Sequence, residues 1–458
     1  MWLSQLATQM QAPWQGADME LVRVSTDTRT LQPGDFFVAL RGEHFDGHSY
    51  LSQALAAGAG GAMVEQAQPL DIAQLIVADT RRGLGRLGQL WLAQFSPRKV
   101  AITGSSGKTT VKEMVASILS QQGPTVYTQG NFNNEIGVPL TLCRVGPEHQ
   151  FLVAELGANH LGEIAYTVDL VQPHVALVNN VGEAHLEGFG SRQNIARAKA
   201  EIYQGLDTDG VAVINLDDDF ADFMLDQTGH CQRCTFSLTD SAADLVVQSV
   251  TFNDAGQAQF SARVGGASVV VKLAVIGKHN VANALAAMAI AHGLGCSPGH
   301  MAAGLAAVKA VPGRLRVVEE LAGYQVIDDS YNANPGSVRS AIDVLASLQR
   351  PTCLVLGDMA ELGPQSPQLH RAVGEYAGRR NIDVVYGLGR NAEQYRQGYL
   401  QSKPQGEFVT AVDHSGLARD LLTRQQDKTI LLKGSRSAAM EKVIAHMLQS
   451  ATSQGSVN

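Results

Sequence analysis

Short, mostly apolar runs alternate along much of the chain with longer segments whose apolar residues recur at helical spacing. Between residues 83 and 312 the short runs lie at 99–103, 151–155, 175–178 and 211–214. Uninterrupted runs of this kind, each followed by a helical pattern, are typical of parallel strands covered by helices on both faces. This part of the chain therefore predicts an α/β unit with a mainly parallel sheet.

The same two patterns appear before this unit, and a different one appears inside it. In residues 20–82, the run 36–40 predicts a buried strand, and 50–55 predicts a helix that Gly58 ends. The turn-rich stretch 231–276 predicts an antiparallel insertion, and an alanine-rich helix begins near Asn280.

Pro312 and Gly313 interrupt the pattern and predict a hinge. Beyond them, strand-like runs again alternate with helices, at 325–329, 352–357, 383–386 and 429–432. A chain of 458 residues is also too long for one hydrophobic core. We predict three domains in an α/β protein: a small α/β domain at 1–82, a central mononucleotide-binding domain at 83–312 and a Rossmann-like domain at 313–458.

Composition narrows the range of partners and compartments. The net charge is -8 and no cluster of Lys and Arg is present, which argues against nucleic acid as a partner. No segment approaches the ~20 apolar residues that cross a bilayer, and no signal peptide is expected at the amino terminus. Cys231 and Cys234 form a lone C-x-x-C without a second pair at metal-site spacing, so reduced thiols in the cytoplasm are expected.

A glycine-rich turn joins the strand 99–103 to a helix that begins near Lys108. Backbone N–H groups of such a turn point at phosphates, the lysine adds positive charge, and the following hydroxyl can bind Mg²⁺. The full eight-residue motif would have glycine at 102, where this chain has Ile102, so the loop is a shorter variant. No N-K-x-D motif that would read guanine follows, which favours ATP. The predicted loop residues are Gly104, Ser105, Ser106, Gly107, Lys108, Thr109 and Thr110.

Two further strands end in polar groups. Glu155 ends the run 151–155, and His185 follows the run 175–178. Nucleotides bind at the carboxyl ends of strands in open α/β sheets, so we expect Glu155 to bind Mg²⁺ beside Thr109, with His185 at the same edge. Lys199 lies in a helical pattern and, taken alone, reads as a solvated lysine.

These residues, in this order, resemble the Mur ligases, the ATP-dependent amide-forming enzymes of bacterial peptidoglycan precursor synthesis. The resemblance covers essentially the whole chain, and the short loop with Ile102 is part of it. The matching blocks are T-G-S-S-G-K-T-T (103–110), N-F-N-N-E-I-G-V-P-L (131–140), E-L-G-A-N-H-L-G-E-I (155–164), G-E-A-H-L-E-G-F-G-S (182–191), A-R-A-K-A-E-I (196–202), G-K-H-N-V-A-N-A-L-A-A (277–287) and P-G-R (312–314).

Three blocks are similar to one branch of the family, the ligase that adds D-alanyl-D-alanine to UDP-N-acetylmuramoyl-tripeptide (UDP-MurNAc-tripeptide). They are D-D-S-Y-N-A-N-P-G-S (328–337), L-G-D-M-A-E-L-G (356–363) and L-K-G-S-R-S (432–437). The D-Y-A-H-T-P and D-N-P-R or D-D-N-P motifs of the preceding ligase are absent. Three alternatives stay open: another Mur ligase, a folylpolyglutamate-type ligase, or a non-catalytic nucleotide-binding switch.

The resemblance also implies roles for single residues. It implies that Lys199 is carbamylated and that the carbamate, with His185, holds a second Mg²⁺. It further implies a monomer. For the nucleotide it implies adenine contacts at Asn280 and Asn283, a phosphate contact at Arg314 and a ribose contact at Asp329. For the other substrates it implies UDP-sugar contacts at Ser25, Thr26, Arg41, Asp46, Gly47 and His48, and dipeptide contacts at Asn332, Asn334 and Arg436.

The resemblance implies that ATP activates a carboxylate, because a carboxylate is a poor electrophile. A carboxylate does not condense with an amine in water, so the γ-phosphoryl group of ATP is expected to activate it as an acyl phosphate, with Lys108 and two Mg²⁺ neutralising charge. The acyl phosphate hydrolyses readily, so we expect the third domain to close the site by a swing about residues 312–314.

Overall fold

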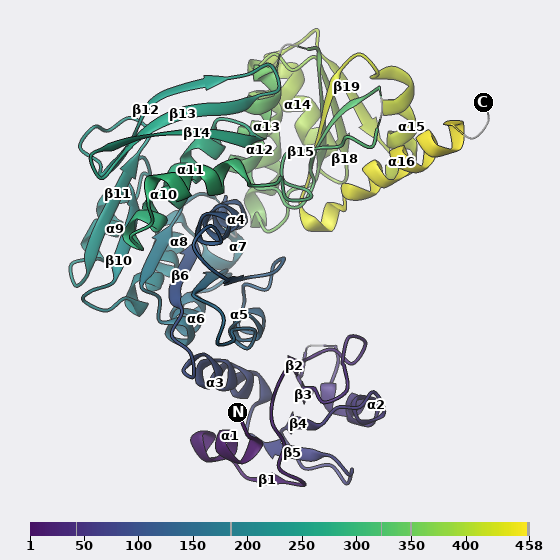
Figure 1. Ribbon diagram of the computed structural model, residues 1–458. Coiled ribbons are helices and arrows are strands. Elements are labelled where there is room, and N and C mark those ends of the chain that lie inside the picture. The colour runs from purple at the N-terminus through teal and green to yellow at the C-terminus, as the bar shows by residue number, and fades with distance from the viewer. Residues whose placement is uncertain (43, 184–185, 322, 349, 456–458) are drawn as a thin grey trace.

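The computed structural model describes residues 1–42, 44–183, 186–321, 323–348 and 350–455, and side chains up to residue 451. The described chain forms three sheets that follow one another along the sequence (Figure 1). The predicted α/β class is confirmed. None of the helices described is both long and apolar enough to span a bilayer.

The first sheet has the strand order β1-β5-β4-β3-β2, with β1 antiparallel to β5 and the other neighbours parallel. The predicted strand at 36–40 and helix at 50–55 are both present, and Gly58 follows the helix with φ +92°. The elements are α1 (Leu3–Met10), β1 (Trp14–Gln15), β2 (Val24–Ser25), β3 (Phe36–Val38), the 3₁₀ helix η1 (Gly47–Tyr50), α2 (Leu51–Ala56), β4 (Gly61–Val64) and β5 (Ala73–Ile76).

Helix α3 (Thr80–Leu92) connects this sheet to the next. Asp79 caps its start by accepting the N–H groups of Arg81 and Arg82. The helix contributes buried residues both to the first core and, through Leu92, to the central one. It spans the expected boundary after residue 82, and Figure 1 shows it as the bridge between the two units. The exact domain limits stay predictions.

The central sheet has nine strands in the order β14-β13-β12-β11-β10-β9-β6-β8-β7. The four predicted strands are β6, β8, β9 and β10, and all pair in parallel. The strands are β6 (Arg98–Thr103), β7 (Thr125–Tyr127), β8 (Phe151–Glu155), β9 (Val175–Val178), β10 (Val211–Asn215), β11 (Gln232–Ser237), β12 (Leu245–Phe252), β13 (Gln257–Val264) and β14 (Ala267–Ile276).

The expected antiparallel insertion at 231–276 is partly wrong. Strand β11 pairs in parallel with β10, and β12 begins parallel to β11. Only the pairs β12–β13 and β13–β14 are antiparallel. The stretch therefore extends the main sheet at its edge and forms no separate layer.

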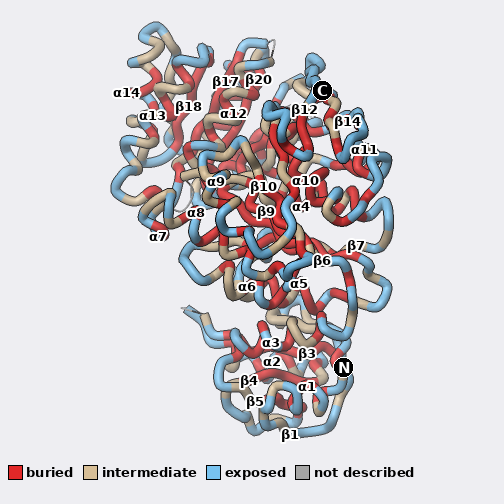
Figure 2. The backbone as a smooth tube through the Cα atoms, turned by 90° about the vertical axis from the view of Figure 1, so that its left-hand side faces the viewer, coloured by how far each residue is buried: buried red, intermediate tan, exposed pale blue. Residues whose placement is uncertain are grey.

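Helices cover both faces of the central sheet. Successive residues of β6 alternate between the two cores: Val100 and Ile102 pack with α4, α10 and α11, and Ala101 packs with α5, α6 and α8. Figure 2 shows the resulting buried centre of the unit. The helices are α4 (Lys108–Leu119), α5 (Gly137–Leu142), α6 (Glu163–Val171), α7 (Leu186–Phe189), α8 (Arg192–Ala200), η2 (Glu201–Gly205), α9 (Ala221–Asp226), α10 (His279–Gly293) and α11 (Pro298–Ala306).

The third sheet has the order β15-β16-β20-β17-β18-β19, and every pair except β15–β16 is parallel. Its strands are β15 (Arg316–Val317), β16 (Gln325–Asp329), β17 (Thr352–Gly357), β18 (Val384–Leu388), β19 (Glu407–Ala411) and β20 (Thr429–Lys433). Its helices are α12 (Pro335–Ser347), η3 (Gly363–Gln365), α13 (Ser366–Arg379), α14 (Ala392–Ser402), α15 (His414–Arg424), η4 (Arg436–Ala438) and α16 (Glu441–Gly455).

Candidate functional site

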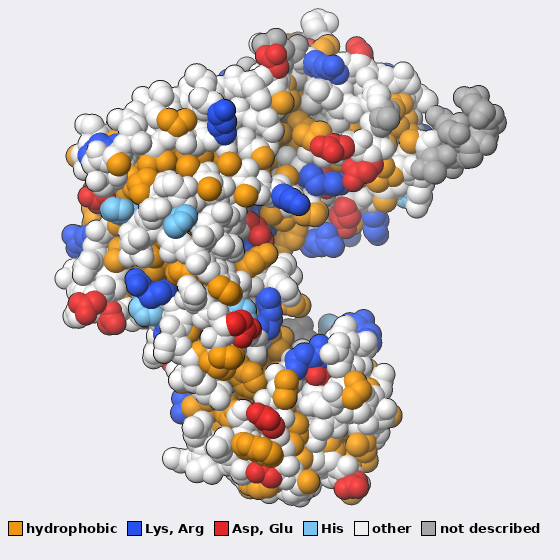
Figure 3. All heavy atoms as spheres, in the orientation of Figure 1, with side chains coloured by type: hydrophobic (Ala, Val, Ile, Leu, Met, Phe, Trp, Pro, Cys, Tyr) orange, Lys and Arg blue, Asp and Glu red, His pale blue; other side chains and the backbone are white. Residues whose placement is uncertain are grey.

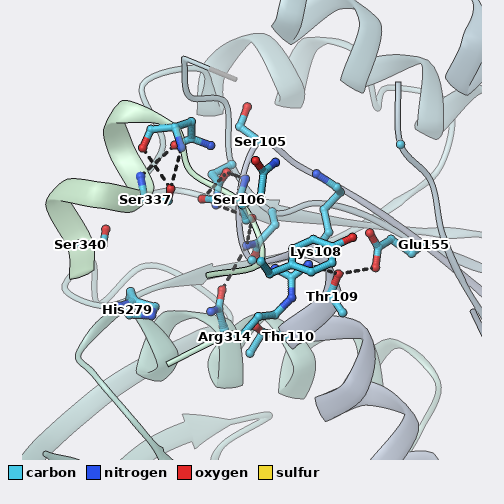
Figure 4. A pocket seen from close by; sticks show the side chains of 18 of the residues that line it. Ser105, Ser106, Lys108, Thr109, Thr110, Glu155, His279, Arg314, Ser337 and Ser340 are labelled. Atoms are coloured by element: carbon cyan, nitrogen blue, oxygen red, sulfur yellow. Dashed lines mark hydrogen bonds between the residues drawn. The ribbon is translucent and has the colours of Figure 1, made fainter. Parts of the chain in front are cut away.

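A cavity of about 620 Å³ lies between the central and third units. The central unit contributes the turn after β6, the loop 131–135, the end of β8, residues 179–180 and the start of α10. The third unit contributes residues 313–315, the end of β16, the start of α12 and the last residue of β20. Carboxyl ends of parallel strands from two sheets thus meet at one site, where the sequence predicted nucleotide binding. Figure 4 shows this cavity from close by.

The predicted phosphate loop forms one wall of the cavity. Residues Ser105 to Thr110 line it, while Gly104 accepts a hydrogen bond from Lys108 Nζ through its carbonyl oxygen at 2.6 Å. Desolvation lowers the pKa of Lys108, and the nearby Glu155 carboxylate opposes that shift. A phosphate group entering here would meet the N-terminus of α4 and a poorly hydrated ammonium, both of which attract anions.

Two asparagines after β9 fix the shape of the loop. Asn180 Oδ1 accepts the N–H of Ser106 at 2.9 Å, and the Nδ2 groups of Asn179 and Asn180 donate to Ser106 O at 3.0 and 3.1 Å. Ser105 Oγ accepts the N–H of Gly182 at 2.8 Å. The loop is therefore held open by the neighbouring strand before any phosphate arrives.

Replacing Gly107 with alanine should weaken ATP binding strongly. Gly107 has φ +77°, and a Cβ there would lie 2.6 Å from both Asn179 Nδ2 and Asn283 Oδ1. We expect the KM for ATP to rise at least about tenfold and the free energy of unfolding to fall by about 1–3 kcal/mol, the usual cost of a left-handed non-glycine residue. Steady-state kinetics and thermal unfolding measure the two effects.

Gly266→Ala is the matched control, because Gly266 has φ +85° and nothing within 4 Å of its added Cβ. That variant should lose a similar amount of stability and keep its KM for ATP. An unchanged KM in the Gly107 variant would contradict the role of the loop.

Thr109, Glu155 and Arg314 meet at the cavity wall. Thr109 Oγ1 donates to Glu155 Oε2 at 2.8 Å and accepts from Arg314 Nη2 at 2.8 Å (Figure 4). Asn133 Nδ2 donates to the other carboxylate oxygen, Oε1, at 2.8 Å. The Arg314 guanidinium also stacks 4.2 Å above the ring of Tyr331. Arg314 lies directly after Gly313, so the predicted hinge already reaches the phosphate loop.

The oxygen ligands at this wall suit a Mg²⁺ ion that arrives with a nucleotide. Among the residues described, no three His, Cys, Asp or Glu side chains gather closely enough to hold a metal ion by themselves. Mg²⁺ in nucleotide sites normally takes one or two protein oxygens and completes its shell with phosphate and water. The hydroxyl of Thr109 and the carboxylate of Glu155, 2.8 Å apart, fit that requirement.

Lys199 is not a solvated lysine. It lies in the last turn of α8, is 2% exposed and does not line the cavity. Burial, and then the positive charge of Lys108, lower its pKa well below the ordinary value. His185, the other residue expected at this place, lies outside the described residues.

The predicted adenine residues are buried in a chain of amides beside the phosphate loop. Asn283 Oδ1 accepts from Asn179 Nδ2 at 3.2 Å, Asn283 Nδ2 donates to Asn280 Oδ1 at 2.9 Å, and Asn280 Nδ2 donates to Ile276 O at 2.7 Å. Both line the cavity, as does the neighbouring His279. Burial, helped by nearby Lys433, lowers the pKa of His279 to about 4, so its ring is neutral near neutral pH.

The predicted ribose residue, Asp329, ends β16 and lines the cavity from the third unit. Its Oδ2 accepts from Lys433 Nζ at 2.6 Å, and its Oδ1 accepts the N–H of Leu315 at 3.2 Å. Burial raises the pKa of Asp329, while the charges of Lys433 and Arg314 oppose that shift.

Two of the three predicted dipeptide residues line the same cavity. Asn332 accepts from Lys433 Nζ through its carbonyl oxygen at 2.9 Å, and Asn334 caps α12 by accepting the N–H of Ser337 at 2.8 Å. Arg436 is absent from the lining; it is exposed and pairs with Glu441 at 3.1 Å.

The predicted UDP-sugar residues lie in the first unit, away from this cavity. Arg41 pairs with Asp46 at 3.2 Å and with Glu65 at 3.1 Å. His48 Nε2 accepts the N–H of Glu65 at 2.9 Å, so the neutral ring carries its hydrogen on Nδ1, 2.6 Å from Asp46 Oδ1. These contacts fix the conformation of the loop that carries Arg41, Asp46 and His48.

The other predicted residues of this group have local tasks. Ser25 Oγ accepts the N–H of Asp27 at 3.2 Å, and Thr26 follows it half-buried. Gly47 is buried at the start of η1, where a Cβ would lie 2.6 Å from Leu40 O. In Figure 3 a deep hollow separates this unit from the rest of the molecule on the side that faces the viewer's right.

A bridge links the first unit to the main cavity. Arg81 Nη2 donates to Arg41 O at 3.1 Å, and Arg81 Nη1 lies 3.4 Å from Glu135, which lines the cavity. Arg81 therefore connects the loop of Arg41 to the lining of the cavity.

Several cavity residues were not singled out from the sequence. They are Asn179 and Asn180, Asn133, His279, Tyr331 and Lys433. Four of them (Asn133, His279, Tyr331 and Lys433) fall inside the blocks quoted for the family resemblance, which is the available signal; Asn179 and Asn180 lie outside those blocks and show in the sequence only as polar residues at a strand end. Their partners lie far away in sequence, so their tasks show only in the fold.

Models of known protein families match three parts of the chain. A family model described as the Mur ligase family catalytic domain matches residues 20–92, one described as the Mur ligase middle domain matches 102–291, and one described as the Mur ligase glutamate ligase domain matches 313–436. Together these matches span most of the chain and all three sheets.

Individual relatives agree with that match. The chain is 46% identical to the UDP-N-acetylmuramoyl-tripeptide–D-alanyl-D-alanine ligase of Escherichia coli (strain K12) over 456 residues, which covers 98% of this chain and 99% of that one. A crystal structure of MurF from Acinetobacter baumannii superposes with a TM-score of 0.89 at 37% identity, covering 97% of this chain and 98% of that chain. The structure of MurF ligase from Thermotoga maritima in complex with ADP gives a TM-score of 0.83 at 29% identity, with 94% and 98% covered. The chain therefore belongs to the Mur ligase family of ATP-dependent amide-forming enzymes, in the branch of the UDP-N-acetylmuramoyl-tripeptide–D-alanyl-D-alanine ligases.

Proposed function

We propose that this protein joins D-alanyl-D-alanine to UDP-MurNAc-tripeptide at the expense of ATP, giving UDP-MurNAc-pentapeptide, ADP and phosphate for peptidoglycan synthesis. The observation that carries the proposal is near-complete coverage by ligases of this activity, at 46% identity in one case. The rival substrates of a folylpolyglutamate-type ligase are not favoured by that coverage. A non-catalytic nucleotide-binding switch would give no role to Asn332 and Asn334 or to the buried Lys199.

ATP is placed with its phosphates at residues 104–110, its adenine near Asn280 and Asn283, and its ribose at Asp329. Every one of these residues except Gly104 lines the same cavity, which supports this placement. Arg314, which now donates to Thr109, is within reach of the same phosphates. For in-line transfer, the tripeptide carboxylate must approach the γ-phosphoryl group on the side opposite the leaving ADP oxygen.

Lys108 has two tasks in the phosphoryl transfer. Its ammonium orients the γ-phosphoryl group and neutralises the charge that spreads over the phosphoryl oxygens in the transition state. Arg314 approaches from the hinge and adds a second cation. The tripeptide carboxylate oxygen attacks phosphorus, ADP leaves, and the resulting acyl phosphate is a good electrophile. The neutral amine of the dipeptide then attacks the acyl carbon, and phosphate departs from the tetrahedral intermediate.

Two Mg²⁺ ions belong to the proposal. Thr109 and Glu155 would hold one, and Lys199 with His185 would hold the second. When bound, the ions supply charge neutralisation on the phosphoryl oxygens. The donor chemistry at Thr109 and Glu155 supports the first site.

Carbamylation of Lys199 makes the second site possible. An ammonium repels Mg²⁺, whereas the neutral amine adds to the carbon of CO₂ and loses one proton, giving an anionic carbamate with oxygen ligands. This reaction needs an unprotonated amine. Burial and the charge of Lys108 lower the pKa of Lys199, which increases the fraction of that form.

The UDP-sugar end is assigned to the first unit, with Ser25, Thr26, Arg41, Asp46, Gly47 and His48 as the contacts. Asn332, Asn334 and Arg436 are assigned to the dipeptide. We also propose a monomer in the cytoplasm. The five cysteines, all free, agree with a reducing compartment.

One incubation tests the proposal. The purified protein is mixed with UDP-MurNAc-tripeptide, D-Ala-D-Ala, ATP and Mg²⁺, and both phosphate and the nucleotide-linked product are measured by enzyme-coupled assay and mass spectrometry. We expect one phosphate per UDP-MurNAc-pentapeptide formed. ATP turnover without an amide product would overturn the assignment, and omission of D-Ala-D-Ala is the control.

A further inference from the structure

Lys433 is a charged residue of the cavity wall to which the proposed reaction gives no task. It is the last residue of β20, is 3% exposed and lines the cavity. Its Nζ donates to Asp329 Oδ2 at 2.6 Å and to Asn332 O at 2.9 Å. A buried ammonium is costly unless it is paired, and the pairing here is with a residue that faces the nucleotide.

The other oxygen of Asp329 is tied to the hinge. Asp329 Oδ1 accepts the N–H of Leu315 at 3.2 Å, and Leu315 has φ +51°, a conformation that leucine rarely adopts. Asp328, the neighbour of Asp329, accepts the N–H of Gly313 at 3.1 Å through Oδ2. The end of β16 therefore holds the hinge in one conformation through two side chains.

We propose that Lys433 is a positioning residue for nucleotide recognition: it clamps the Asp329 carboxylate against the hinge so that the free lone pairs of that carboxylate face the ribose hydroxyls of ATP. The inference rests on the proposed function, because it takes ATP as the ligand of the cavity. It adds a residue on β20 that acts on the ribose only through Asp329.

The hydrogen-bond inventory of Asp329 supports this arrangement. A carboxylate has about four acceptor sites, and Lys433 and Leu315 use one on each oxygen. Asp329 lines the cavity, so its remaining acceptor sites can receive hydrogen bonds from the two hydroxyls of a ribose. Without Lys433 the carboxylate would keep the Leu315 N–H on Oδ1 and lose the contact that fixes Oδ2.

Charge gives Lys433 a second reason to be present. Burial already raises the pKa of Asp329, and Lys433 and Arg314 are the cations that oppose it. His279, which also lies near Lys433, is neutral near neutral pH and adds no charge. Removing the ammonium would favour the protonated acid, which donates a hydrogen bond where the ribose requires an acceptor.

The test compares ATP with dideoxy-ATP, which lacks both ribose hydroxyls. The readout is the ATP preference, defined as the ratio of kcat/KM for the two nucleotides, in wild type and in Lys433→Met. We expect the preference to fall about tenfold, the worth of roughly one hydrogen bond to a charged group, while kcat/KM for dideoxy-ATP changes much less. Lys442→Met, which removes an exposed lysine of α16, should leave both values unchanged.

A mutant cycle separates positioning from simple damage. Asp329→Asn should lower the preference as well, and Lys433→Met combined with Asp329→Asn should lower it no further. If Lys433→Met does not fold, as judged by thermal unfolding, Lys433→Gln takes its place. Its amide can still donate to one carboxylate oxygen, so its preference should fall to a value between those of wild type and Asp329→Asn.

Two results would overturn the inference: an equal loss with both nucleotides, which marks a purely structural role, or an unchanged preference. Failure of the proposed function is distinguishable, because wild type would then form no amide product with either nucleotide.

Discussion

Replacing Lys108 with alanine should reduce kcat for ligation by about 10³-fold, the upper range for removing one preorganised donor to a developing charge. The side chain leaves the first turn of α4 and rests on Gly104 O at 2.6 Å, directly at the phosphate-binding turn. Desolvation lowers the pKa of Lys108, and the nearby Glu155 carboxylate opposes that shift. The variant should therefore lose the chemical step far more than it loses folding stability. Phosphate release and pentapeptide formation measure the rate, and thermal unfolding measures the stability.

The control is Lys309→Ala, which removes a positive charge from an exposed position after α11. It should keep wild-type kcat and KM. A Lys108→Ala enzyme that retains more than about a tenth of wild-type kcat would show that Arg314 alone can neutralise the phosphoryl group.

Most of the strands were predictable because their signal is local. The runs 99–103, 151–155, 175–178 and 211–214 are buried on both faces, and such strands carry unbroken apolar sequence. Partner choice is not local. The stretch that begins at 232 has strand character. Its parallel pairing with β10 shows only in the fold, where β11 also packs against α10. Cys234 of the lone C-x-x-C lies in that core, and burial raises the pKa of its thiol to about 12.

The residues of the candidate site also divide into those with a local sequence signal and those without one. The phosphate loop was predictable because its strand, turn and helix follow one another within a dozen residues. Asn180 acts on Ser106 from 74 positions away, and Lys433 acts on Asp329 from 104 positions away. Those contacts exist only because β9 lies beside β6 and β20 lies beside β16. Lys199 shows the converse, because its helical pattern alone predicted a solvated residue whereas the fold buries it.

If Lys199 carries the proposed carbamate, replacing it with alanine should leave the enzyme nearly inactive, with kcat reduced by at least about 10²-fold, because the variant would lack the proposed ligand of the second Mg²⁺. Folding should be affected little, since alanine removes a buried group that is charged either as the ammonium or as the carbamate. Kinetics at saturating Mg²⁺ and a thermal unfolding curve separate these effects. Arg197→Ala, an exposed residue of the same helix, is the matched control and should keep its activity.

The carbamate itself is tested by chemical rescue. In Lys199→Ala the missing side chain leaves room for a small carboxylate, so acetate or propionate should restore part of kcat in a saturable manner. Chloride at equal ionic strength should not, since it lacks the two oxygens that Mg²⁺ prefers. Wild type, in turn, should lose activity reversibly when CO₂ is removed at low pH and recover it with bicarbonate, because the reaction needs both CO₂ and the neutral amine. Wild-type rates in Lys199→Ala would contradict the carbamate role, and an inactive variant that no carboxylate rescues would leave Lys199 a structural residue in a site that takes its second ion elsewhere.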